Sequence, residues 1–93
     1  LRDLKCIEIN EAFAAMPLVS TKIMAGGDAK ELARLRSMTN VNGGSVAIGH
    51  PPGASGARVA MAAVRELRRR GGGYAAAGIC GGFGQADALI LKA

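Results

Sequence analysis

The sequence is poor in aromatic residues and has no apolar segment long enough to cross a membrane. Aromatic residues make up 3% of the 93 residues, and there is no Trp. Proteins that bind single-stranded nucleic acid stack bases on aromatic rings, so the net charge of +5 alone does not favour that class. No apolar run approaches the roughly 20 residues that span a bilayer. We therefore expect a soluble protein that binds neither nucleic acid nor membrane.

The chain also lacks a secretory signal and a cysteine framework. Residues 1–5 contain no apolar signal region and no Met. The two cysteines, Cys6 and Cys80, lie in different contexts and do not suggest a disulfide scaffold. We expect both to be reduced thiols in a cytoplasmic protein, and we expect the chain to be a segment of a longer one.

Hydrophobic residues (49%) and charged residues (20%) indicate one globular domain over residues 1–93. Hydrophobic periodicity and turn residues predict the order β-α-β-α-β-β. The expected elements are a strand at 4–9, helices at about 16–25 and 28–38, a short strand at 41–42, a helix at 54–70, and strands at 74–79 and 86–91. This order predicts an α/β fold with a mixed, mostly parallel sheet and helices on both faces. In the helix at 54–70, the expected buried stripe is Ala57, Ala60, Met61, Val64 and Leu67.

The glycine-rich segment 40–56 contains the only histidine, His50, just before the helix at 54–70. Glycine permits close approach of the backbone and proline fixes φ, so such a segment can aim a side chain. A lone histidine in a loop of this kind is more often an ordinary surface residue. The rest of the chain favours a functional role.

Three candidate groups, Asn10, His50 and Cys80, each follow an apolar run. Residues at the carboxyl ends of parallel strands converge on one crevice, so the three side chains are expected to share a pocket. A cysteine near a histidine can act as a nucleophile or proton carrier, and amide or imidazole groups can donate to an oxyanion. Asn10 is equally well explained as a turn or cap residue, and Cys6 as a small buried hydrophobe. No metal-binding cluster or phosphate-binding loop is present in the sequence.

The motifs together resemble the C-terminal part of the thiolases, which make or cleave 3-ketoacyl-CoA. The matches are N-E-A-F at 10–13, N-G-G at 42–44, G-H-P at 49–51, G-A-S-G at 53–56, C-x-G at 80–82 and G-Q at 84–85. The resemblance implies that Asn10 holds a water which, with His50, binds the thioester oxygen. It implies that Cys80 carries a proton and that the Gly82 N–H contributes to a second oxyanion hole.

The same resemblance implies a substrate site and partners. Phe13 would line the acyl pocket, and Gly49 and Pro51 would contact substrate beside His50. Coenzyme A would be a substrate, with no other cofactor and no metal. The nucleophilic cysteine would lie in an upstream N-terminal half, so this chain alone would be inactive, and the full enzyme would be a homo-oligomer, a dimer or tetramer. Pro52, Phe83 and Ala86 depart from the family pattern.

Each thiolase half resembles a five-stranded sheet of order 3-2-1-4-5. Strand one would precede Leu1, so the resemblance implies a missing central strand between residues 4–9 and 74–79. We therefore expect a gap in the sheet and a chain that does not fold on its own. Two alternatives stay open. A related condensing enzyme generally lacks the C-x-G cysteine, and a non-catalytic remnant or assembly subunit would keep only the fold.

Overall fold

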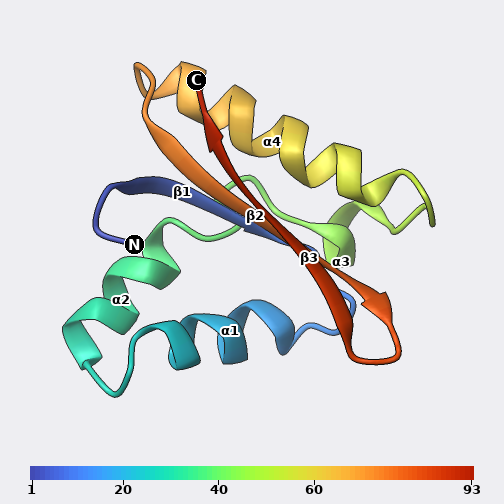
Figure 1. Ribbon diagram of the computed structural model, residues 1–93, viewed down its shortest axis with the longest axis horizontal. Helices are drawn as coiled ribbons and strands as arrows, with labels where there is room; N and C mark the ends of the chain where they lie inside the picture. Colours follow the sequence, from blue (N-terminus) through green and yellow to red (C-terminus); the bar gives the residue numbers. More distant parts are fainter.

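A computed structural model describes all 93 residues as a three-stranded sheet with helices on both faces (Figure 1). The strands are β1 (Leu4–Ile9), β2 (Tyr74–Gly82) and β3 (Gln85–Lys92). The helices are α1 (Met16–Met24), α2 (Ala29–Ser37), α3 (Ser45–Ile48) and α4 (Ser55–Arg69). The α/β class and the mixed sheet are therefore confirmed.

The strand order is β1-β2-β3, with β1 and β2 parallel and β2 and β3 antiparallel. The expected gap between the first strand and residues 74–79 is absent, because Ile7 lies directly opposite Ala76 in the ladder. The prediction that a missing central strand leaves a gap is therefore wrong for this structure. Direct pairing satisfies the backbone N–H and C=O groups that a gap would have left unpaired.

Two apolar layers fix the helices against the sheet. In Figure 1 the sheet is seen edge-on, with α4 on one side and α1 and α2 on the other. The α4 side is formed by Cys6, Ala63, Leu67 and Ala75. The opposite layer consists of Leu4, Ile7, Ala25, Leu35 and Met38. Asp28 caps α2 as expected, since its Oδ1 accepts from the N–H groups of Lys30 and Glu31 at 2.8 and 3.1 Å.

The predicted strand at 41–42 does not form. Pairing along that side of β1 is limited to one bridge between Ile7 and Thr39. Beyond this bridge, the Asn40 side-chain amide takes the place of a neighbouring strand and pairs with the backbone of Ile9. Its Oδ1 accepts from Ile9 N at 2.8 Å and its Nδ2 donates to Ile9 O at 2.9 Å. A side-chain amide that completes the ladder in this way leaves no backbone pair for residues 41–42.

The buried side of α4 also differs from the predicted stripe. Its buried residues are Ser55, Val59, Ala63, Glu66 and Leu67. Of the predicted residues only Leu67 is buried, and Ala57 and Met61 are exposed. The buried side is rotated relative to the predicted stripe and includes Glu66, whose hydrogen-bond partners periodicity alone does not reveal.

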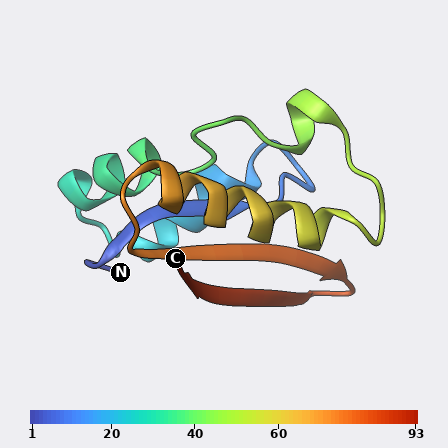
Figure 2. The same ribbon diagram turned by 90° about the horizontal axis from the view of Figure 1, so that it is seen from above.

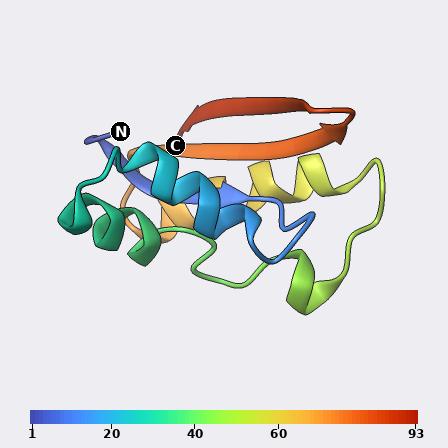
Figure 3. The ribbon, with the colours of Figure 1, turned by 90° about the horizontal axis from the view of Figure 1, so that it is seen from below.

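Several apolar side chains lie on the outside of this chain. They belong to α1, α3 and β3: Leu18, Val19, Ile23, Val46, Ile48, Leu89 and Ile90. In Figures 2 and 3, β3 forms the outer edge of the sheet. None of the helices has the length and apolar character required to cross a membrane.

Candidate active site

Asn10 stands at the carboxyl end of β1 and its side chain is buried. Its backbone N–H donates to Gly78 O at 2.9 Å, which continues the β1–β2 pairing by one residue. Its Oδ1 accepts a hydrogen bond from Ser45 Oγ at 2.6 Å. Helix α1 begins later, after Ala15, and has no side-chain cap. The cap interpretation of Asn10 is therefore wrong, and its side chain contacts α3 instead.

His50 follows α3, and its ring is held by the first residue of α4. The apolar run Val46–Ile48 belongs to helix α3, so the expectation that His50 follows a strand is wrong. The ring Nδ1 lies 2.7 Å from Ser55 Oγ, and Ser55 is almost fully buried. Ser55 Oγ also lies 3.3 Å from Pro51 O. The shorter contact to the ring favours donation from Ser55 Oγ to Nδ1 over donation to Pro51 O, and the ring proton then lies on the outer Nε2, which is a donor.

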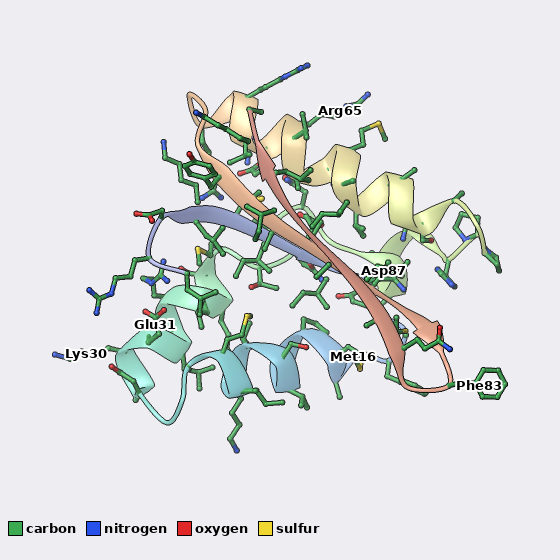
Figure 4. The ribbon with its side chains drawn as sticks, in the orientation of Figure 1. Met16, Lys30, Glu31, Arg65, Phe83 and Asp87 are labelled. Atoms are coloured by element: carbon green, nitrogen blue, oxygen red, sulfur yellow. The ribbon has the colours of Figure 1, made fainter.

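Cys80 lies within β2 rather than after it, because pairing with β3 extends β2 to Gly82. The thiol is exposed and lines a cavity of about 270 Å³. Asn10 lines the same cavity, as do Met16 of α1 and Asp87 of β3, both labelled in Figure 4. The remaining walls are mostly apolar residues of β1, α1, β2 and β3. The space therefore brings Cys80 and Asn10 together with an apolar lining.

The structure brings the three candidate groups together only in part. His50 does not line the cavity of Asn10 and Cys80, so the expected single pocket is not formed within this chain. The segment before α4 and the β2–β3 turn do lie at the same end of the molecule (Figures 2 and 3). Asn10 is the link, because it shares the cavity with Cys80 and bonds to Ser45, close to the His50 loop.

The other predicted site residues have different environments. Phe13 is 73% exposed and does not line the cavity, so the expectation that it lines a pocket is not met within this chain. Gly49 O accepts from Arg58 Nη1 at 2.7 Å, and Pro51 O faces Ser55. Gly82 has φ of 86°, which permits the tight β2–β3 turn. Phe83, in that turn, points into solvent (Figure 4).

The motif residues Glu11 and Gly44 are in contact and join two loops that sequence reasoning did not connect. Glu11 Oε2 accepts from Val46 N at 2.8 Å, at the start of α3. A Cβ added to Gly44 would lie 2.7 Å from the same oxygen. A side chain at 44 would therefore displace the Glu11 carboxylate from Val46 N. Sequence reasoning likewise assigned no role to Ser45, Ser55 or Arg58, although Ser55 lies in the G-A-S-G motif.

Three buried groups have shifted pKa values. The pKa of the Glu8 carboxyl is raised from 4.5 to about 7, first by burial and then by the negative charges of Glu66 and Glu11. Burial also raises the pKa of the Cys6 thiol to about 11, which fits the prediction of a small buried hydrophobe. Hydrogen bonds from Arg69, Asn42 and Arg70 lower the pKa of Glu66 to about 2.

The fold and the site define an α/β domain in which Cys80 and Asn10 line one cavity near a histidine loop. The family model described as the C-terminal domain of thiolase matches residues 1–93. The chain therefore belongs to the thiolase family and corresponds to its C-terminal domain.

Relatives and solved structures agree with this assignment. A probable acetyl-CoA acetyltransferase of Mycolicibacterium smegmatis is 56% identical over 90 residues, which are 97% of this chain and 21% of the relative. The human mitochondrial 3-ketoacyl-CoA thiolase is 45% identical over 92 residues, 99% of this chain and 21% of the relative.

A crystal structure of the human enzyme in complex with CoA matches with a TM-score of 0.79 at 42% identity, over 99% of this chain and 21% of that chain. The acetyl-CoA acetyltransferase of Bacillus anthracis matches with a TM-score of 0.82 at 41% identity and the same coverage. The chain thus spans about 21% of the length of the relatives it matches.

Proposed function

We propose that this chain is the C-terminal catalytic segment of a thiolase that transfers acyl groups between coenzyme A thioesters. The reaction is a Claisen condensation or its reverse, thiolysis of a 3-ketoacyl-CoA. The observation that carries the proposal is the cavity shared by Asn10 and Cys80, with Asn10 also bonded to Ser45 near the His50 loop. Membership of the thiolase family supports it.

The proposed roles follow from the chemistry of each group. In condensation, the Cys80 thiolate takes a proton from the α-carbon of acetyl-CoA, and His50 and a water held by Asn10 donate hydrogen bonds to the enolate oxygen. The carbanion forms a carbon–carbon bond with an acyl group held as a thioester on a second cysteine. The carbon–sulfur bond to that cysteine then breaks and releases its thiolate, while the Gly82 N–H helps to hold the second oxyanion.

The second cysteine and the rest of the substrate site belong, in this proposal, to an upstream thiolase half. That half would cover the exposed apolar side chains of α1, α3 and β3 and complete the wall next to Phe13, Gly49 and Pro51. Coenzyme A is then a substrate and no other cofactor is required. A homo-oligomeric enzyme in the cytoplasm stays our prediction.

A hybrid protein tests the proposal. In the hybrid, this chain replaces the matching 21% of the Mycolicibacterium smegmatis relative. We expect the hybrid to condense two acetyl-CoA to acetoacetyl-CoA and free CoA, and to catalyse the reverse thiolysis. His50→Ala and Cys80→Ala should each lower kcat by about 100-fold to 10,000-fold, the usual contribution of general acid–base groups. Arg65→Gln, on the exposed side of α4, is the matched control and should be neutral.

The isolated chain provides the complementary measurement. We expect no turnover and no acyl-enzyme, because the remaining donors stabilise only charge that a nucleophile creates. Turnover by the isolated chain that is abolished by Cys80→Ser would make Cys80 the nucleophile. A folded hybrid without transfer would instead favour a non-catalytic, structural role.

A further inference from the structure

Arg58, on the first turn of α4, connects the two loops of the candidate site. Its Nη1 donates to Gly49 O at 2.7 Å, immediately before His50. Its Nη2 donates to Ser45 Oγ at 2.6 Å, and Ser45 Oγ in turn lies 2.6 Å from Asn10 Oδ1. One guanidinium therefore contacts the backbone beside the histidine and, through one hydroxyl, the amide of Asn10.

The chemistry of arginine favours one direction for this chain of hydrogen bonds. A guanidinium has only donors, so Ser45 Oγ must accept from Arg58. The single hydrogen of the Ser45 hydroxyl is then free to donate, and its partner must be an acceptor. If the amide turned over, Nδ2 could donate to the second lone pair of Ser45 Oγ, but the Ser45 hydrogen would lose its acceptor, so the orientation with Oδ1 toward Ser45 is favoured.

The remaining end of the amide is the donor Nδ2. It donates to no other protein group, since the only hydrogen bond of the Asn10 side chain is to Ser45. Among the buried side-chain nitrogen and oxygen atoms, only Glu8 Oε1 has no hydrogen-bond partner. Asn10 Nδ2, which also has no partner, is therefore not fully buried. Asn10 lines both the cavity that contains Cys80 and a smaller one next to Ser45 and Arg58, and Nδ2 is the group of its side chain that is left without a protein partner.

We propose that Arg58 is a positioning residue that acts through Ser45 to hold the Asn10 amide with its donor available to substrate. Through Gly49 O the same guanidinium also holds the backbone that carries His50. This inference rests on the proposed function, in which His50 and a water held by Asn10 donate to the thioester oxygen. Arg58 does not touch substrate. It fixes the orientation of one donor and the placement of the other.

The electrostatic surroundings agree with a role for a charged donor at this position. Arg58 lines a second, smaller cavity of about 90 Å³ together with Glu8, Asn10 and Ser45. The positive charge of Arg58 lowers the pKa of Glu8, against the larger raising effect of burial. A neutral side chain at 58 would lose the attraction to the Glu8 carboxylate. It would also lose the property of having only hydrogen-bond donors.

The test compares Arg58→Gln with Arg65→Gln in the hybrid. Both substitutions remove an arginine from α4, but Arg65 makes no hydrogen bond or ion pair and points outward (Figure 4). Glutamine can donate or accept, so it no longer imposes the direction on Ser45. We expect Arg58→Gln to lower kcat by about 10-fold to 100-fold with little change in KM, as for lost support of an active-site group. Arg65→Gln should leave both unchanged. Arg58→Lys keeps a donor-only group but cannot bridge both partners, and should fall between Arg58→Gln and the unsubstituted hybrid.

A double-mutant cycle separates positioning from a general loss of stability. In an Asn10→Ala background, Arg58→Gln should cause much less additional loss, because the amide it orients is gone. Equal effects in both backgrounds would overturn the proposal, as would unchanged kcat in Arg58→Gln. If Arg58→Gln does not fold, Ser45→Ala breaks the same connection and carries the same expectations.

The orientation itself can be read without turnover. An atomic-resolution crystal structure of the hybrid distinguishes the nitrogen and oxygen of the Asn10 amide. We expect Oδ1 toward Ser45 in the unsubstituted protein and mixed orientations in Arg58→Gln. A single unchanged orientation in Arg58→Gln would overturn the inference. An inactive hybrid with the expected orientations would instead overturn the proposed function alone.

Discussion

Gly44 and Glu11 are in contact across two loops: a Cβ on Gly44 would lie 2.7 Å from Glu11 Oε2 and 2.8 Å from its Cδ. The same carboxylate accepts from Val46 N at 2.8 Å. The N-E-A-F and N-G-G motifs are therefore parts of one packed unit. Its effect is to set the start of α3, and with it Ser45, against Asn10.

We predict that Gly44→Ala displaces Glu11 and destabilises the site. Overpacking of this kind costs about 1–3 kcal/mol, measured as the free energy of unfolding of the hybrid in urea. Because the backbone at Gly44 is extended, with φ of −154°, the cost is steric and not conformational. Adding Glu11→Ala to Gly44→Ala should recover part of the stability. A double variant no more stable than Gly44→Ala would show that the clash is not the cause.

We predict that Asn10→Asp folds but loses activity. The aspartate keeps an oxygen that accepts from Ser45 and loses the Nδ2 donor, and it places a negative charge beside the developing oxyanion. The expected loss in kcat of the hybrid is about 100-fold to 1,000-fold, as for removal of one oxyanion donor. Retention of full activity by Asn10→Asp would contradict the donor role.

We predict that the two thiols differ in their reactivity. Cys80 is exposed, whereas Cys6 is buried with a pKa raised to about 11, so little thiolate is available at neutral pH. Iodoacetamide treatment of the native hybrid should modify Cys80 well before Cys6, as followed by peptide mass spectrometry. Coenzyme A at saturating concentration should slow the modification of Cys80. Equal rates at the two positions, in folded protein, would refute the assigned burial.

We predict that Glu8 lowers stability as the pH rises. Its pKa is about 7 in the folded protein against an ordinary 4.5, so between these values the folded state holds a proton that the unfolded state releases. The free energy of unfolding should therefore fall between pH 4.5 and 7, by at most about 1.4 kcal/mol per pH unit. Glu8→Gln should remove this dependence and make the hybrid more stable than the parent at pH 8.

Asp3→Asn is the control for this measurement, because Asp3 is an exposed carboxylate. It should leave the slope between pH 4.5 and 7 unchanged. Stability profiles of Glu8→Gln and the parent that run parallel through this range would show that Glu8 is charged in the folded protein.

Local patterns predicted most of the regular structure. Alternation and apolar runs located β1, β2 and β3, and the Asp28 cap located the start of α2. The errors arise where a side chain from elsewhere changes the outcome. The Asn40 amide pairs with Ile9 and ends the ladder before residues 41–42. Partners from Asn42 and two arginines allow Glu66 to be buried on α4.

The sequence by itself determined the chemical groups of the site and the family to which the chain belongs, because motif residues and their order are written in the chain. Only the tertiary structure decided that Asn10 and Cys80 share a cavity, that His50 lies outside it, and that Arg58 and Ser45 connect Asn10 to the histidine loop. Those contacts join residues 13 and 35 positions apart. Hydrogen bonds over such separations depend on how strands and helices pack, and they leave no periodic signal in the sequence.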